Sequence, residues 1–204
     1  MTFTMTLAAL VVLSQAPAAV DPPHHHHHQA PAEKAAAPST RSLYNLGAKW
    51  KDSTGKRLVL QDLRGKVVVL SMIYTSCQTV CPLIASDVAR IFGKLPEAVR
   101  PRVHLVLVSF DPERDTPAKL ASYAASRRLE GAQWTLLTGD PNGVRDLAAL
   151  LGMKYRSMGN GDFAHSNLIT VLDQEGVIVH RSEGVGQDAA AIVDAIVSAA
   201  PSSP

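Results

Sequence analysis

Apolar residues follow two alternating periodicities along residues 42–200. The runs Val67–Ile73 and Val103–Phe110 are almost continuously apolar over a strand's length, which is typical of strands covered on both faces. The segment Pro82–Leu95 between them repeats its apolar residues at helical spacing. Helices between buried strands predict an α/β fold, a central mixed sheet with helices on both faces.

Capping and turn residues predict the remaining elements. Thr116 as N-cap and Pro117 in the first position predict a helix that ends near Arg128. A second helix over Asn142–Leu151 is closed by Gly152. The shorter predicted elements are strands at Leu58–Leu60 and Trp134–Leu137, a hairpin of Asn167–Leu172 with Val177–His180, and a helix over Gln187–Ala199. No internal repeat or second folded domain is predicted.

The first 20 residues have the pattern of an export signal. Leu7–Leu13 form an apolar core, and Ala16–Ala18 offer small residues at cleavage spacing. An uncleaved anchor is the alternative, although the apolar core is shorter than the roughly 20 residues of a membrane span. We therefore expect a periplasmic or otherwise exported protein, in a compartment that favours disulfides.

Residues 21–41 are rich in His, Pro and Ala, which predicts a flexible tether ahead of a folded domain at 42–200. The tether contains five consecutive histidines: His24, His25, His26, His27 and His28. Neutral imidazoles bind Cu(II) or Zn(II), so an accessory metal-gathering role is one interpretation. A cloning tag and a solvated low-complexity stretch are the others.

Charge and composition exclude some functions. The chain has 20 Lys and Arg against 18 Asp and Glu, and no basic cluster is interleaved with aromatic residues. This balance argues against nucleic acid as a partner and against attraction to an anionic membrane surface. The apolar content of 46% is that of a globular protein with a sizeable core.

The chain has two cysteines, Cys77 and Cys81, at the point where a predicted buried strand gives way to a helix. A helix N-terminus lowers the pKa of a nearby thiol, and we expect Cys81, on the first turn, to have the lowered value. Three interpretations are open at this stage: a structural disulfide, a redox pair and a soft-metal site. A disulfide across so short a loop would gain little entropy.

Three histidines lie outside the run. His104 falls inside a predicted buried strand, and His180 ends the last hairpin, where we expect it to be exposed. His165 is predicted in the loop Gly159–Ser166, directly before a strand. It is either a third metal ligand or a loop histidine bonded to a backbone carbonyl.

Three separated motifs carry a family resemblance. Tyr74–Cys77 with Val80–Pro82, then Ser109–Pro117, then His165–Ser166 resemble the Sco/SenC family in order and spacing. The resemblance covers about Leu43–Ala199. It implies a thioredoxin-like sandwich fold.

The same resemblance implies a site that holds one copper ion, Cu(I) or Cu(II), through Cys77, Cys81 and His165. Asp111 matches a family acidic residue near the metal, where it would orient or exchange copper. Gln78–Thr79 departs from the Pro-Asp or Pro-Glu common between the family's cysteines, which leaves all three ligands in place but replaces a rigid residue of the loop.

These features predict an exported metallochaperone that delivers copper to an apo-cuproprotein. The family points to the dinuclear copper centre of a cytochrome oxidase subunit, and nitrous-oxide reductase is another recipient to consider. The alternative is a thiol-disulfide oxidoreductase that keeps the target's copper-ligand cysteines reduced, itself served by a thioredoxin-type reductant. A thiol peroxidase is disfavoured, because Gln78 replaces the threonine usual three residues before the reactive cysteine.

Overall fold

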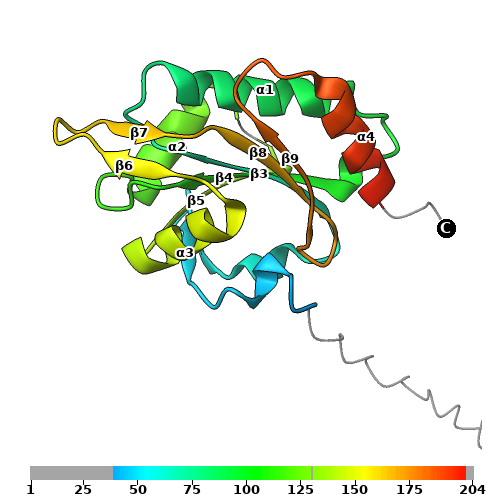
Figure 1. Ribbon diagram of the computed structural model, residues 1–204, viewed down its shortest axis with the longest axis horizontal. Coiled ribbons are helices and arrows are strands. Elements are labelled where there is room, and N and C mark those ends of the chain that lie inside the picture. The colour runs from blue at the N-terminus through cyan, green and yellow to red at the C-terminus, as the bar shows by residue number, and fades with distance from the viewer. Residues whose placement is uncertain (1–38, 130, 201–204) are drawn as a thin grey trace, which may run out of the picture. The chain divides into compact units, whose positions relative to one another are not determined.

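The computed structural model describes residues 39–129 and 131–200, which form a seven-stranded sheet and a separate two-stranded one (Figure 1). The strands are β1 Trp50–Asp52, β2 Arg57–Leu58, β3 Val67–Ile73, β4 Val103–Ser109, β5 Trp134–Gly139, β6 Tyr155–Ser157, β7 Phe163–His165, β8 Leu168–Leu172 and β9 Ile178–Glu183. The α-helices are α1 Val80–Lys94, α2 Pro117–Ser126, α3 Pro141–Leu151 and α4 Ala189–Ala199. Three 3-10 helices, Leu43–Asn45, Leu60–Leu63 and Arg100–Arg102, complete the described elements.

The large sheet has the strand order β2-β1-β5-β4-β3-β8-β9. β3 runs parallel to β4 on one side and antiparallel to β8 on the other, and β4 runs parallel to β5. Every residue of β3 is buried, which confirms the prediction from its continuous apolar run. Cys77 lies in the turn that follows this central strand.

Helices cover both faces of the sheet, as Figure 1 shows, with α1 and α4 on one face and α3 on the other. Ile91 of α1 and Ile192 of α4 share a buried cluster with Val69 of β3. Leu147 of α3 belongs to a second cluster that contains Leu70 of β3. Successive β3 residues therefore point into different cores, as the pleat of a strand requires. The predicted layered α/β architecture is confirmed.

The predicted helix boundaries are nearly right. The Thr116 hydroxyl accepts a hydrogen bond from the Lys119 amide at 3.3 Å and caps α2. Gly152 ends α3 in the left-handed region with φ 76°. α1 begins at Val80, two residues before the predicted start, so Cys81 lies within its first turn.

At the edge of the large sheet, one predicted strand needs correction and one strand was not predicted. β2 ends at Leu58, and Leu60 instead begins a 3-10 helix. β1 was not predicted because it is three residues long and its Trp50 gains burial only through the tertiary fold. Trp50 pairs with Gly139 of β5, where a Cβ atom would come within 2.6 Å of the indole.

The segment Gly159–Ser166, predicted as a loop, is part of a second small sheet. β6 and β7 pair antiparallel, with Tyr155 opposite His165 and Ser157 opposite Phe163. The pattern was missed because each strand has three residues and neither is fully buried. His165 therefore lies on a strand rather than in a loop.

The structure does not describe residues 1–38. The predicted export signal, the histidine run His24–His28 and most of the predicted tether therefore lie outside the described residues. The domain boundaries at 1–20, 21–41 and 42–200 stay predictions. Among residues 39–129 and 131–200, no helix is long and apolar enough to cross a membrane.

Candidate metal centre

The chain turns sharply between β3 and α1, and this turn carries the first cysteine. The Cys77 amide donates to the Tyr74 carbonyl at 3.3 Å, which closes the turn. The Cys77 Sγ atom then accepts the Cys81 amide at 3.4 Å, at the start of α1. This amide is one of the N–H groups that a helix leaves without an internal partner. Both cysteines are free thiols, and both are buried.

His165 reaches the cysteines from the β6–β7 hairpin. It is half-buried, and its Nδ1 atom lies 3.1 Å from the Ser166 carbonyl oxygen. Because a carbonyl oxygen only accepts hydrogen bonds, Nδ1 is the donor in this contact, and in the neutral ring this leaves Nε2 as the nitrogen with a free lone pair. A neutral imidazole with one free nitrogen is the form that binds a metal ion.

The three side chains meet at one point. The ligand atoms of Cys77, Cys81 and His165 all lie within 4.8 Å of one another. Two sulfurs and one imidazole nitrogen are a donor set suited to a soft or borderline ion such as copper or zinc. The residues fit a metal ion, because all three donor atoms lie close together and their chemistry suits a soft or borderline ion.

Aromatic rings surround the imidazole. The His165 ring lies edge-on to Tyr74 at 5.9 Å between centroids and tilted against Phe110 at 5.1 Å. Phe163 packs against the same two rings at 5.2 and 5.4 Å. These contacts join the hairpin to the ends of β3 and β4 and exclude water from one side of the histidine.

The two thiols have opposite pKa shifts. Burial raises the pKa of Cys77, but hydrogen bonds from backbone amides, first that of Cys81, outweigh it and lower the pKa to about 6. Burial raises the pKa of Cys81, and the nearby charges of Cys77 and Asp115 raise it further. The prediction that Cys81 has the lowered pKa is therefore wrong, because the helix amides face the sulfur of Cys77.

Residues 40–200 match the family model described as SCO1/SenC. The chain belongs to the SCO1/SenC family. The predicted family is thereby confirmed on almost the whole described part of the chain.

One protein and two solved structures show what this SCO1/SenC protein is similar to. A Stutzerimonas stutzeri protein described as copper-binding is 30% identical over 129 residues, which are 61% of this chain and 62% of that protein. The structure of Bradyrhizobium japonicum ScoI with copper bound has 26% identity and a TM-score of 0.58, covering 74% of this chain and 96% of that one. BsSco, described as a Sco cytochrome c oxidase assembly protein with a disulfide switch, has 25% identity and a TM-score of 0.65, covering 74% and 90%. The fold is thioredoxin-like, as these Sco structures are, which confirms the prediction.

The three-residue group does not include the other candidate residues of the described part of the chain, Asp111, His104 and His180. Asp111 is buried and accepts a hydrogen bond from Arg114 Nε at 2.5 Å. Burial raises the pKa of Asp111, and Arg114 opposes that rise. Its carboxylate is thus engaged with an arginine, and a role near the metal stays a prediction. His104 bonds Thr135 at 2.8 Å, and His180, expected to be exposed, is half-buried on β9.

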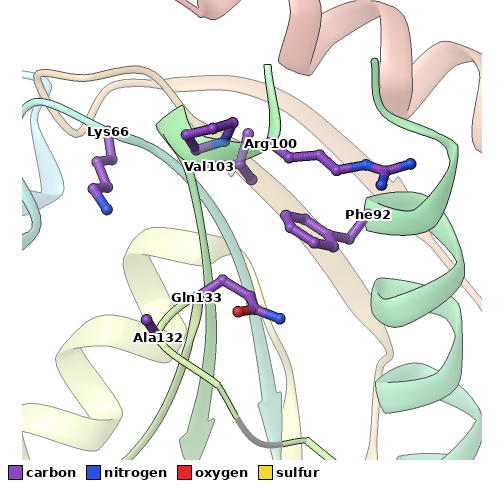
Figure 2. Close-up of a pocket in the computed structure, with 7 residues that line it drawn as sticks. Lys66, Phe92, Arg100, Val103, Ala132 and Gln133 are labelled. Atoms are coloured by element: carbon purple, nitrogen blue, oxygen red, sulfur yellow. The ribbon is translucent and has the colours of Figure 1, made fainter. Parts of the chain in front are cut away.

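A cavity of about 240 Å³ lies at the opposite end of the central strands, lined by Lys66, Phe92, Arg100, Pro101, Val103, Ala132 and Gln133. Lys66 directly precedes β3 and Val103 begins β4, whereas Cys77 follows the other end of β3. In the view of Figure 2 the Lys66 amine points away from the Arg100 guanidinium. The Arg100 guanidinium also donates hydrogen bonds to the Gly93 and Leu95 carbonyls. The cavity therefore does not present Lys66 and Arg100 as a pair of free cations for an anionic ligand.

Proposed function

We propose that this SCO1/SenC protein is an exported metallochaperone that binds one copper ion, Cu(I) or Cu(II), through Cys77, Cys81 and His165. It delivers the ion to an apo-cuproprotein, the cytochrome oxidase subunit that holds the dinuclear copper centre. The observation that carries the proposal is the convergence of the three ligand atoms within 4.8 Å. Two relatives support it, a copper-bound ScoI and a Sco protein described as a cytochrome c oxidase assembly protein.

Each ligand has a distinct part in copper capture. With a pKa of about 6, Cys77 is mostly thiolate at neutral pH and provides the first strong bond to the ion. Cys81, whose pKa is raised, releases its proton as the ion binds. His165 contributes neutral Nε2. Asp111, with Arg114, stands at the end of β4 and would assist exchange with the recipient.

A transfer experiment tests delivery. Reduced, copper-loaded full-length protein is mixed anaerobically with the apo copper-binding domain of a cytochrome oxidase subunit. A one-electron oxidant such as ferricyanide is then added, and the optical spectrum of the oxidised dinuclear centre is followed. We expect the centre to form, and to form much less from the His165→Ala variant loaded with the same amount of copper. A spectrum that does not develop with the wild-type protein would contradict delivery to this recipient.

A second function, thiol-disulfide exchange, is favoured by the low pKa of Cys77 beside a second free thiol. The Cys77 thiolate would attack a target disulfide and release one target thiolate. Cys81, once deprotonated, would then attack the mixed disulfide, release the second target thiolate and leave a Cys77–Cys81 disulfide. A thioredoxin-type reductant would return two electrons to the pair.

The Cys81→Ser variant separates this function from copper binding alone. It should accumulate a mixed disulfide between Cys77 and the oxidised target domain, detectable by mass under non-reducing conditions. The Cys77→Ser variant is the matched control and should form none. If Cys81→Ser forms no adduct either, thiol-disulfide exchange with this target is excluded.

A further inference from the structure

A buried carboxylate lies directly behind the turn that carries Cys77. Asp115 has no exposed surface, and it lies between the end of β4 and the start of α2. Its Oδ2 atom accepts the Thr75 amide at 2.9 Å and the Ser109 hydroxyl at 2.6 Å. Its Oδ1 atom accepts the Thr75 hydroxyl at 2.5 Å. Two of its three side-chain hydrogen bonds therefore go to a single residue, Thr75.

The rest of the protein fixes Asp115 in place. Its own amide donates to the Asp111 carbonyl at 2.9 Å, and the Ser109 hydroxyl in turn accepts the Asp111 amide at 3.0 Å. The next residue, Thr116, caps α2. The carboxylate is thus anchored to the end of β4 and to a helix start, independently of the cysteine turn.

Thr75 is the second residue of the turn from Tyr74 to Cys77, which the Cys77 amide closes. Gripping both the amide and the hydroxyl of this residue fixes the direction in which the turn leaves β3. A buried carboxylate is costly unless its oxygens receive several hydrogen bonds, so rotation of Thr75 away from Asp115 carries a large penalty. Because Cys77 follows two residues later in the same turn, restricting Thr75 also restricts the position of Cys77.

We propose that Asp115 is a positioning residue of the metal centre, which holds Thr75 and thereby aims the Cys77 sulfur at Cys81 and His165. The inference rests on the proposed copper site and adds a residue that the ligand set does not contain. Outer-shell groups of this kind usually change metal affinity by about 10- to 100-fold when they are removed.

Two substitutions around the same carboxylate separate positioning from stability. Thr75→Val removes the hydroxyl on the cysteine turn, and Ser109→Ala removes a hydroxyl on the anchoring side. Both variants lose a hydroxyl hydrogen bond to Asp115, so both should lower the melting temperature of the copper-free protein. Thr75→Ser is the conservative variant, because it restores the hydroxyl.

The readouts are Cu(I) affinity by competition with a chelator, the thiolate-to-Cu(II) absorption band, and the alkylation rate of Cys77 in copper-free protein. We expect Thr75→Val to lose about 10-fold or more in affinity, to shift the band and to change the alkylation rate. Thr75→Ser should match the wild type in all three, and Ser109→Ala should change them less than Thr75→Val does, because Asp115 then keeps both of its hydrogen bonds to Thr75. Asp115→Asn, which keeps the shape of the side chain, is tested in parallel and keeps the experiment informative if Thr75→Val does not fold.

The outcomes distinguish this inference from the proposed function. If the wild type binds copper but Thr75→Val has wild-type affinity, band and alkylation rate, the positioning role is wrong. Equal losses in Thr75→Val and Ser109→Ala, in proportion to their melting temperatures, would also overturn it. Failure of the wild-type protein to bind copper would instead contradict the proposed copper site.

Discussion

The cysteine turn and the β6–β7 hairpin supply ligands to one site, but different forces hold them. The turn is fixed by hydrogen bonds, from Thr75 to the buried Asp115 and from the Cys81 amide to the Cys77 sulfur. The hairpin has three residues in each strand, and its ligand is held by ring contacts with Tyr74 and Phe110. Hydrogen bonds define a direction, whereas ring packing mainly defines a distance.

This difference predicts an order of robustness. The cysteine turn should keep its geometry when the hairpin is perturbed, because Thr75 is held by Asp115 and Cys77 is held by the Tyr74 carbonyl and the Cys81 amide. The hairpin depends on Tyr74, which is part of the turn, so damage to the turn should reach His165. The cysteine turn thus keeps its geometry without the hairpin, whereas the position of His165 in the hairpin depends on the turn.

Replacing either cysteine should have the largest effect. Cys77→Ser or Cys81→Ser leaves one thiolate and one imidazole, and the affinity for Cu(I) should fall by more than about 100-fold, the upper range for loss of an outer-shell group. The measurement is competition with a chromogenic Cu(I) chelator under anaerobic conditions. Retention of near wild-type affinity by either variant would contradict a site built on both sulfurs.

Removing the histidine should cost less and should depend on the oxidation state. His165→Ala should lower the affinity for Cu(II) by at least about 10-fold and that for Cu(I) by less, because two thiolates satisfy Cu(I) better than Cu(II). Its matched control is His180→Ala, since His180 is half-buried on β9 and outside the ligand group. Equal affinities in the two variants would remove His165 from the site.

Weakening the ring packing should affect the hairpin alone. Phe163→Ala should lower the free energy of unfolding by about 1–3 kcal/mol, because a partly exposed ring loses less than a fully buried one. It should also shift the Cu(II) absorption band while the alkylation rate of Cys77 stays as in wild type. Phe92→Ala, in the cavity at the other end of the sheet, is the control and should leave the band unchanged. A changed alkylation rate in Phe163→Ala would break the proposed independence of the turn.

The two thiols should titrate separately. Thiolate forms as pH rises through the pKa, so alkylation of Cys77 should reach half of its maximal rate near pH 6. Alkylation of Cys81 should stay slow at neutral pH, because its pKa is raised. The Cys81→Ser and Cys77→Ser variants isolate each rate. A half-maximal rate for Cys77 at or above pH 8 would show that the helix amides do not activate it.

The smallest effect is expected away from the site, at His104. Burial lowers its pKa, with help from Lys66, so the folded state keeps the ring neutral while the unfolded chain takes up a proton. The stability it contributes is present above the unfolded pKa, about 6.5, and is lost as pH falls through the lower folded value. The free energy of unfolding, measured with urea, should fall less from pH 8 to pH 5 in His104→Gln than in the wild type, by about 1 kcal/mol or less. An identical pH dependence in both proteins would contradict the lowered pKa.

The same two halves differ in how far the sequence predicted them. The cysteine half follows from local patterns, because the apolar run Val67–Ile73 and the helical stripe beyond Pro82 define the strand and the helix without tertiary information. The hairpin does not. Its short strands are stabilised by the rings of Tyr74 and Phe110, which follow β3 and β4, so tertiary contacts outweigh the weak local signal of Phe163–His165.

The chemistry of the site shows the same limit. Motifs alone predict the three candidate ligands that the structure brings together. The predicted order of the thiol pKa values is wrong, since spacing does not show which sulfur faces the helix amides. Asp115 was part of a recognised motif and received no role, because its partner Thr75 is 40 residues away in the chain. A buried carboxylate and its donors become visible only when strand ends are brought together.

The central claim is that Cys77, Cys81 and His165 together bind one copper ion. The most direct test is X-ray absorption at the copper edge on the full-length, copper-loaded protein, with all five residues of His24–His28 replaced by Ala in a parallel sample. The prediction is one copper per chain with two sulfur neighbours and one imidazole nitrogen, unchanged in the parallel sample, with the nitrogen lost in His165→Ala. A copper ion surrounded by nitrogen alone, or a spectrum that His165→Ala leaves unchanged, would contradict the claim.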